Sequence, residues 1–286
     1  MSAKNYCMLG LPASGKTTFL AAFTYMLMEH TKEVSLHMKP GASPEGFTAQ
    51  FREEIDRWTN FLPLNHTGVG QIHRMKYTLY SADEVPYILD VPDRSGETFR
   101  SMIEDRYIDD NMREDWSRAD EILFFVNFEK MDMGDKDALF TEIPPKIQEI
   151  MAESSENASA GEKTFMFPDQ YALVELLQML YDIRKDITKI KFIISAWDKV
   201  QEENKEAGKI LPEEIFQDKL PLVYQFICAN TEEFAVQYWG VSAQGGDLQD
   251  EAEIERMVEE VEAMKRVQVV EPDGTISFDL SKIFLK

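Results

Sequence analysis

A glycine-rich segment at residues 10–17, with the sequence G-L-P-A-S-G-K-T, has the spacing of a phosphate-binding loop. Glycines let the backbone curl until successive N–H groups point at one anion, and the N-terminus of a following helix adds positive potential. Lys16 would then reach the β- and γ-phosphates of a nucleotide, and the Thr17 hydroxyl would bind Mg²⁺. The residues expected around the phosphates are Gly10, Pro12, Ala13, Ser14, Gly15, Lys16, Thr17 and Thr18.

The elements that must position this loop are also visible in the sequence. A short apolar run at 6–9 predicts a buried strand before it, and the run at 18–27 predicts a helix after it. This strand–loop–helix context separates a phosphate-binding loop from the alternative, a glycine turn before an ordinary helix.

Further strand patterns alternate with helical segments, which favours an α/β fold with a mostly parallel central sheet between two helical layers. Residues 71–80 alternate polar and apolar side chains, so we expect one antiparallel, half-exposed strand at the sheet edge. The other expected strands are 85–91, 121–127, 190–195 and 234–241.

Asp90 is expected near the end of the buried strand at 85–91. Ligands of parallel sheets bind at the carboxyl ends of the strands. An aspartate there can hold Mg²⁺ through water and complete a metal site begun by Thr17. The alternative is a helix N-cap or a surface acid.

Two later segments have the residue types that recognise a guanine base. Asp198 follows the strand at 190–195 and could accept hydrogen bonds from N1 and N2 of guanine, a donor pair that adenine lacks. Such a bidentate pair contributes about 1–3 kcal/mol of discrimination. Ser242 and Ala243 follow the next strand, where small residues let backbone N–H groups approach a base oxygen. Taken alone, these would be an N-cap and a glycine turn.

These four elements, in this order, resemble the Ras-like P-loop GTPases of the TRAFAC class, and most of all the large bacterial double-GTPase and conflict-system GTPase domains. In the resemblance, Asp90 matches the aspartate of DxxG, Asp198 that of [N/T]KxD, and Ser242-Ala243 the SA of SAK. It covers residues 1–286 as a single domain. It implies GTP or GDP and Mg²⁺ as cofactors. It also implies a switch that hydrolyses GTP slowly and signals to a protein effector through its switch regions.

The resemblance also implies switch and catalytic residues, which this chain matches less closely than it matches the phosphate-binding loop. Thr67 is the best-placed switch I threonine for Mg²⁺ and the γ-phosphate, although it could equally be an ordinary loop residue. With Asp90 as the motif's aspartate, Asp93 occupies the glycine position, so Gly96 and Glu97 would form a displaced switch. Arg94 is a candidate built-in arginine finger, with an exposed loop arginine as the alternative.

The base-binding motif departs from the family pattern at Ala196, where a lysine normally covers the base. Loss of that alkyl stem would cost about 1–2 kcal/mol in packing. Trp197 either compensates or packs into the core. The departures leave two competing functions open, namely a pseudo-GTPase scaffold that holds nucleotide without turnover, and a P-loop kinase or ATPase.

Three regions extend the basic pattern. Residues 32–70 form a long switch I region with a helix predicted inside it, and 129–169 form an insertion with a mobile loop. Residues 247–286 predict an acidic surface helix followed by a hairpin with its turn at Asp273-Gly274.

The composition and net charge exclude some classes of binding partner. The formal net charge of −22 argues against a nucleic-acid backbone or an anionic membrane surface as a partner. Two cysteines, no signal-peptide pattern and no apolar stretch of membrane-spanning length predict a cytoplasmic protein. The sequence leaves the oligomeric state open.

Overall fold

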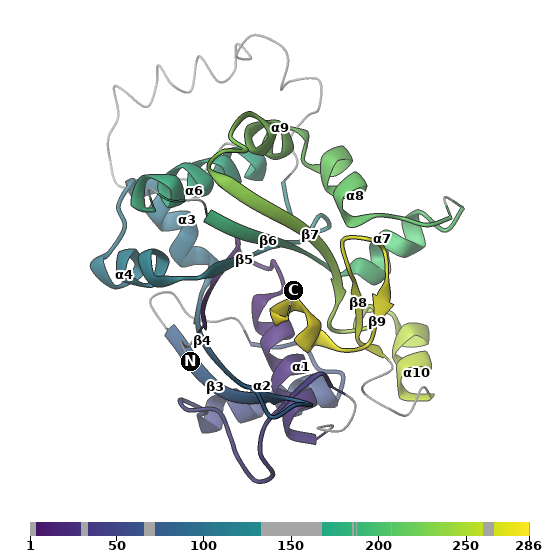
Figure 1. Cartoon of the computed structure of the whole chain (residues 1–286). Helices are drawn as coiled ribbons and strands as arrows, with labels where there is room; N and C mark the ends of the chain where they lie inside the picture. The colour runs from purple at the N-terminus through teal and green to yellow at the C-terminus, as the bar shows by residue number, and fades with distance from the viewer. Residues whose placement is uncertain are drawn as a thin grey trace, which may run out of the picture.

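The computed structural model describes residues 4–29, 34–65, 72–132, 168–184, 186, 188–206, 208–259 and 266–285. Within them, one nine-stranded sheet runs through the molecule in the order β2-β3-β4-β1-β5-β6-β7-β8-β9 (Figure 1). The strands are β1 (Lys4–Leu9), β2 (Leu36–His37), β3 (Ile72–Ser81), β4 (Pro86–Arg94), β5 (Glu121–Val126), β6 (Thr188–Ser195), β7 (Phe234–Ser242), β8 (Gln268–Val270) and β9 (Ile276–Ser277).

The central strands β4, β1, β5, β6 and β7 are parallel, as the alternating pattern predicts. The antiparallel part is larger than expected. β3 is not at the edge, because β2 pairs with it antiparallel. At the opposite edge the hairpin of β8 and β9 extends the sheet antiparallel to β7.

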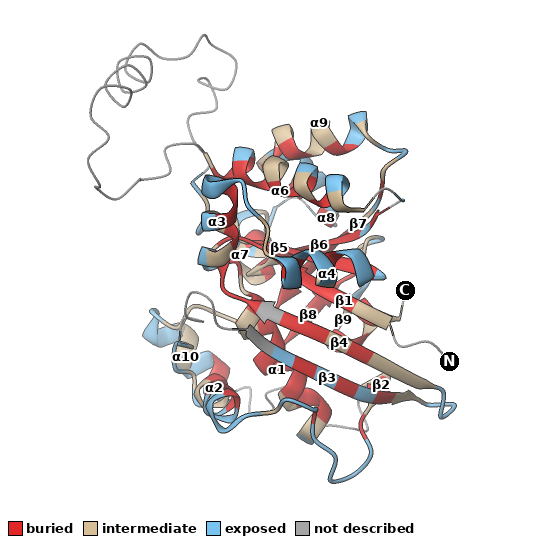
Figure 2. Cartoon of the chain, turned by 90° about the vertical axis from the view of Figure 1, so that its left-hand side faces the viewer, coloured by how far each residue is buried: buried red, intermediate tan, exposed pale blue. Residues whose placement is uncertain are grey.

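Helices cover both faces of the sheet. They are α1 (Lys16–Glu29), α2 (Ala49–Thr59), α3 (Gly96–Asp105), α4 (Asp110–Arg118), α6 (Asp169–Ile183), α7 (Trp197–Glu203), α8 (Pro212–Lys219), α9 (Pro221–Ala229), α10 (Glu251–Glu259) and a short 3₁₀ helix (Leu280–Phe284). The residues of the central strands and of the inner sides of the helices are mostly buried (Figure 2).

The buried apolar side chains form two clusters, and the alternation of side chains along the strands explains this division. Successive side chains of a strand point to opposite faces. Tyr6 and Met8 of β1 therefore belong to the apolar cluster with α1 and α2, whereas Cys7 and Leu9 belong to the cluster with α3, α4 and α6. This places the residues after Leu9 at the sheet's carboxyl edge, with helices on either side.

The C-terminal segment packs beside α1. Ring centroids of Phe284 and Tyr6 lie 5.0 Å apart, and the Lys191 ammonium donates to the Ile283 carbonyl at 2.7 Å. The hairpin turns at Gly274, which has a φ of 79°. The short 3₁₀ helix thus covers apolar side chains of β1 and α1 at the end of the chain.

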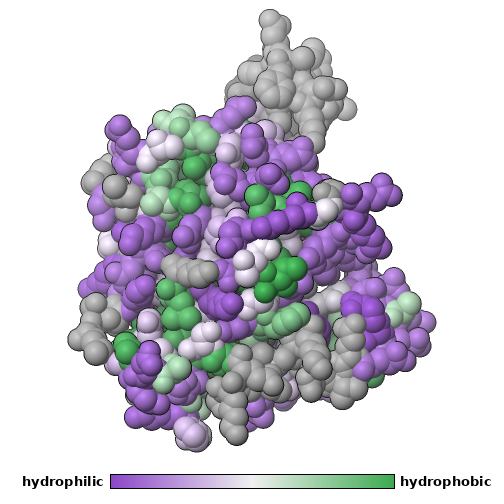
Figure 3. Space-filling model, turned by 45° about the vertical axis from the view of Figure 1, so that its right-hand side comes forward, coloured by the Kyte–Doolittle hydropathy of each residue, from purple (hydrophilic) through white to green (hydrophobic). Residues whose placement is uncertain are grey.

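Hydrophilic side chains cover most of the face shown in Figure 3, with small hydrophobic patches between them. Among the helices that the structure describes, none combines the length and apolar composition that crossing a membrane requires. Thr67 and residues 133–167, which include the predicted mobile loop, lie outside the described residues.

Candidate functional site

The glycine-rich loop joins β1 to α1 at the carboxyl edge of the sheet. Lys16 is the first residue of α1, and its ammonium donates to the carbonyls of Gly10 and Leu11 at 2.8 and 3.3 Å and to Ser14 Oγ at 3.1 Å. A buried cation enclosed by a curled loop fits an anion such as a phosphate, because the phosphate would replace these weaker neutral acceptors. Thr17 follows on the first turn of α1.

Two glycines of this loop allow the neighbouring strands to approach. A Cβ atom at Gly10 would lie 2.6 Å from the Phe125 carbonyl oxygen, and one at Gly15 would lie 2.8 Å from Ser195 Oγ. A hydrogen bond stabilises the contact with β6, since Ser195 Oγ donates to the Ser14 carbonyl at 2.5 Å. The phosphate-binding loop is therefore held against the ends of β5 and β6.

Asp90 does not lie at this edge, so the structure does not bring this predicted metal ligand to the phosphate-binding loop. β4 continues to Arg94, and Asp90 pairs in register with Asn5, near the start of β1. Its carboxylate accepts bidentate hydrogen bonds from Arg74 at 2.9 and 3.0 Å. The apolar run that predicted the strand ends at Val91, but pairing with β3 extends the strand to Arg94.

Arg94 is not available as an arginine finger. Its side chain is 5% exposed, and it binds Asp115 of α4 at 2.8 Å, with Asp109 at 3.9 Å. Asp115 also accepts from Arg74 at 2.9 Å. The Arg94 guanidinium therefore holds α4 against the sheet through these ion pairs.

We predict that Arg94→Met lowers the free energy of unfolding by about 3 kcal/mol, because it breaks a buried ion pair and leaves Asp115 with one arginine. Nucleotide affinity and hydrolysis should stay within about twofold of the unmutated protein. Urea unfolding, followed by nucleotide titration of the folded variant, checks both parts. A large loss of hydrolysis with unchanged stability would restore the arginine-finger hypothesis.

The stretch Asp93-Arg94-Ser95-Gly96 has D-x-x-G spacing, which the sequence interpretation missed by starting from Asp90. The backbone of Asp93 pairs with His73 near the end of β4, and Gly96 begins α3. A Cβ atom at Gly96 would lie 2.2 Å from the Pro12 nitrogen, so this turn rests directly on the phosphate-binding loop. The signal was present in the sequence as the spacing itself.

Ser95 and Glu97 flank that contact. Ser95 caps α3, accepting from the Thr98 N–H at 3.2 Å, which explains why the helix starts at Gly96. Glu97 is exposed in the first turn of α3. The structure therefore brings Gly96 against the phosphate-binding loop, and Glu97 is the next residue along α3.

The base-recognition residues meet at the ends of β6 and β7. Ser242 Oγ donates to the Asp198 carboxylate at 2.6 Å and orients it. The Ala243 carbonyl accepts from Trp58 Nε1 at 2.9 Å, which ties this loop to α2. Ala196 adopts a left-handed conformation with a φ of 51°, and so turns the chain from β6 into α7.

Trp197 packs into the core rather than over a ligand. It is 1% exposed, and a Cβ atom at Gly240 would lie 2.3 Å from its ring. Only glycine at that point of β7 lets the indole lie flat on the strand. Of the two interpretations of Trp197, the structure supports the core residue.

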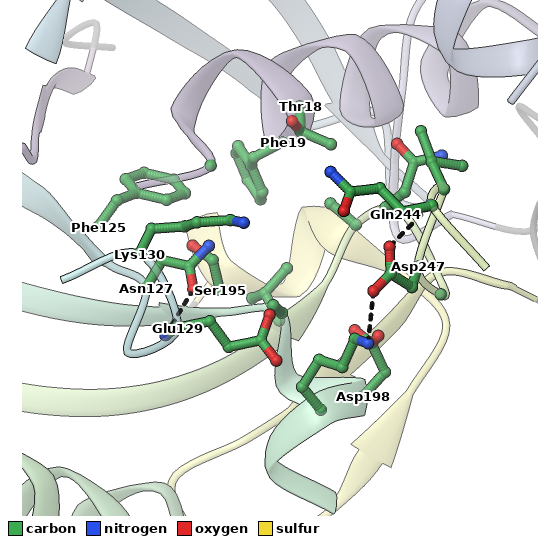
Figure 4. A pocket seen from close by; sticks show the side chains of 18 residues that line it. Thr18, Phe19, Phe125, Asn127, Glu129, Lys130, Ser195, Asp198, Gln244 and Asp247 are labelled. Atoms are coloured by element: carbon green, nitrogen blue, oxygen red, sulfur yellow. Dashed lines mark hydrogen bonds and ion pairs between the residues drawn. The ribbon is translucent and has the colours of Figure 1, made fainter. Parts of the chain in front are cut away.

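A pocket of about 200 Å³ joins the two parts of the site (Figure 4). The buried amide nitrogen of Gln244 in its wall has no hydrogen-bond partner, which fits a ligand with an acceptor atom such as a purine base. Its lining residues are Gly15, Thr18, Phe19, Phe125, Asn127, Glu129, Lys130, Ser195, Ala196, Asp198, Lys199, Val241, Ala243, Gln244, Gly246, Asp247, Leu248 and Gln249.

A parallel sheet with this loop, and with an aspartate held by the serine of the next strand end, is the architecture of a P-loop GTP-binding domain. The chain belongs to the Double-GTPase 1 family, whose model matches residues 7–284. A comparison with curated proteins finds no match.

Solved structures with similar folds include GTPases of several kinds. The Roco2 RocCORdC structure of Methanosarcina barkeri, bound to GDP, is 11% identical with a TM-score of 0.34, and covers 97% of this chain and 52% of that one. This chain thus spans about half of that protein. The SRb-GTP/SRX complex of Chaetomium thermophilum is 8% identical with a TM-score of 0.43, and the match covers 85% of this chain and 92% of that one. The Arl6 BBS3 GTPase of Trypanosoma brucei, with GppNp, is 12% identical with a TM-score of 0.30, covering 93% and 99%. These values are too low to assign an activity.

Proposed function

We propose that this protein is a guanine-nucleotide switch that hydrolyses GTP slowly with Mg²⁺. The observation that supports it best is the contact between the two halves of the site, in which Ser195 of the base-side motif donates to the Ser14 carbonyl of the phosphate-binding loop. One nucleotide can then place its phosphates at Lys16 and its base at Asp198. Membership of the double-GTPase family supports the same conclusion.

Base recognition follows from the charges at the pocket. The Asp198 side chain, oriented by Ser242, would accept from N1 and N2 of guanine. The backbone N–H groups around Ala243 and the unpartnered amide of Gln244 would donate to the base's acceptors. Adenine presents the wrong donor pattern to the same carboxylate, so the site favours guanine.

The metal would lie between the phosphates and the end of β4. Mg²⁺ usually takes one or two protein oxygens and keeps several waters, completing its shell with phosphate oxygens. The Thr17 hydroxyl and Asp93, in place of Asp90, are the protein ligands that we assign to it. Thr67, the proposed switch I ligand, remains a prediction because it lies outside the described residues.

The switch would operate at the start of α3. The Gly96 N–H lies beside the phosphate-binding loop, where a γ-phosphate could hold it and release it after hydrolysis. An effector that reads α3 and the 32–70 region would then distinguish the two states. Family membership by itself does not identify this partner.

Nucleotide competition and phosphate release test the proposal. Nucleotide-free protein should bind GDP and GTP at least about tenfold more tightly than ADP and ATP, and should release phosphate from GTP only with Mg²⁺. Lys16→Ala should abolish both binding and release, since it removes the cation at the phosphates. Equal affinity for adenine and guanine nucleotides would contradict the proposal.

Glu97 is the residue we assign to orienting the attacking water, since it follows Gly96 directly. Glu97→Ala should lower the phosphate-release rate about tenfold or more and leave the Kd for GDP within about twofold, because a water-orienting group acts mainly in the transition state. Single-turnover phosphate release beside a GDP titration checks this. A parallel rise in Kd would instead place Glu97 in nucleotide binding.

Two features of the sequence favour the pseudo-GTPase alternative, namely Asp93 at the expected glycine position and the absence of a clear counterpart to the water-orienting glutamine of Ras-like proteins, and the first of them no longer applies. Asp93 no longer counts as an acid in place of the glycine, because D-x-x-G now runs from Asp93 to Gly96. A glutamate where Ras-like proteins orient water with glutamine still favours binding without turnover. Tight GTP binding with no Mg²⁺-dependent phosphate release would establish that alternative.

A further inference from the structure

The pocket has an uncovered side where the family's base-covering lysine would stand. Ala196 lines the pocket with no more than a methyl group, and Trp197 is turned into the core. A purine ring next to Asp198 would therefore have one face open to water unless another element covers it. The neighbouring strand β5 supplies the nearest candidate.

β5 and β6 pair in parallel with Val126 opposite Ile194, which brings the chain after β5 alongside Ser195 and Ala196. That chain forms a tight turn. The Lys130 N–H donates to the Asn127 carbonyl at 3.1 Å, and the Asn127 side chain donates to the Ala13 carbonyl at 3.3 Å. Lys130 is thus carried on a turn anchored to the phosphate-binding loop.

The Lys130 side chain is aimed into the pocket. It lines the pocket together with Ala196 and Asp198, and Figure 4 shows its chain extending across the pocket above Ser195 with the nitrogen inward. Within the described part of the chain, its ammonium has no hydrogen bond or ion pair. The alkyl stem and the charge are both placed to meet a ligand.

The other lysine in the pocket wall is already engaged. Lys199 binds Asp247 at 2.9 Å, and that hydrogen bond raises the Lys199 pKa. The Gln249 N–H, then Lys199, lower the pKa of Asp247, so the pair stays ionised at neutral pH. Lys199 therefore fastens α7 to the loop after Ala243 and is not free to cover a base.

We infer that Lys130, which follows β5, covers the face of the guanine base. Ala196, which follows β6, has only a methyl group and cannot cover it. The inference rests on the proposed function, since it assumes a guanine base beside Asp198. A lysine stem packs on flat apolar surface while its ammonium is attracted to a ring face. Lys130 thus strengthens binding of the nucleoside part, while Asp198 selects guanine.

Calorimetry of nucleotide-free protein tests this with two probes, GDP and inorganic pyrophosphate. Lys130→Ala should weaken GDP binding about tenfold, which corresponds to about 1.4 kcal/mol, and leave pyrophosphate binding unchanged. Lys130→Met keeps the stem without the charge and should lose part of that affinity. The matched control is Lys205→Ala, an exposed lysine outside this pocket whose side chain pairs with Glu202.

A second experiment moves the lysine from position 130 to position 196. Ala196→Lys in the Lys130→Ala background should restore most of the GDP affinity, because position 196 already tolerates a Cβ atom at its left-handed φ. Unchanged GDP binding by Lys130→Ala, an equal loss of pyrophosphate binding, or a folded double variant that stays weak would each overturn the inference. Failure of the proposed function is distinct from these, since the unmutated protein would then not prefer GDP over ADP.

Discussion

Asp93→Ala is expected to lower Mg²⁺-dependent GTP hydrolysis about 100-fold, whereas Asp90→Ala should leave it within about twofold. Loss of a group that positions charge at the phosphates typically has effects of that size. Asp93 lies near the end of β4, directly before the turn that rests on Pro12. Asp90 lies opposite Asn5 and is bound by Arg74.

The pair of variants is informative because the two aspartates differ in their proposed roles. Asp93 is assigned to the metal, whereas Asp90 forms an ion pair with Arg74. Asp90→Ala should instead reduce stability by about 1 kcal/mol, since Arg74 is half exposed and keeps Asp115 as a partner. Phosphate release over an Mg²⁺ titration, together with urea unfolding of both variants, separates the outcomes. Loss of hydrolysis in Asp90→Ala with Asp93→Ala unaffected would return the metal site to Asp90.

Asp198→Asn is expected to weaken GDP binding about 30-fold and to strengthen binding of xanthosine diphosphate. The carboxylate accepts from both N1 and N2 of guanine, and a good bidentate pair contributes about 1–3 kcal/mol. An asparagine has only one acceptor atom where the carboxylate has two, but its amide nitrogen can donate to the oxygen that xanthine has in place of the N2 amino group. Ser242 still has an oxygen to donate to, so the side chain should keep its orientation.

Competition between GDP, xanthosine diphosphate and ADP measures this change of preference. Inorganic pyrophosphate is the internal control, because its binding depends on Lys16 and not on Asp198. If the variant lost GDP and pyrophosphate alike, the substitution would have disturbed the phosphate-binding loop through Ser195 and Ser14. Unchanged GDP affinity would remove Asp198 from the base site.

The sequence located the phosphate-binding loop correctly because that motif is local. Lys16 and the glycines lie within a few residues of each other, and the flanking runs predict their own strand and helix. The base side was predictable for a related reason. Asp198 and Ser242 each follow a strand, and the carboxyl ends of parallel strands meet at one edge.

The end of β4 was not predictable in the same way. Its last residues, Pro92, Asp93 and Arg94, are not an apolar run, and they become strand only because Arg74, His73 and Ile72 of β3 pair with them. Strand length depends here on a partner that lies elsewhere in the chain. The sequence interpretation therefore began the D-x-x-G motif at Asp90 rather than at Asp93.

The sequence by itself determined that this chain has the spacing of a phosphate-binding loop at residues 10–17 and a mostly parallel α/β sheet, since both follow from local spacing and periodicity. Only the tertiary structure decided which acids and cations remain for the nucleotide. Arg74, Arg94 and Asp90 are occupied by ion pairs among β3, β4 and α4, whereas Lys130 projects into the pocket. A side chain's availability depends on neighbours that are distant in sequence, and only the packed fold brings those neighbours together.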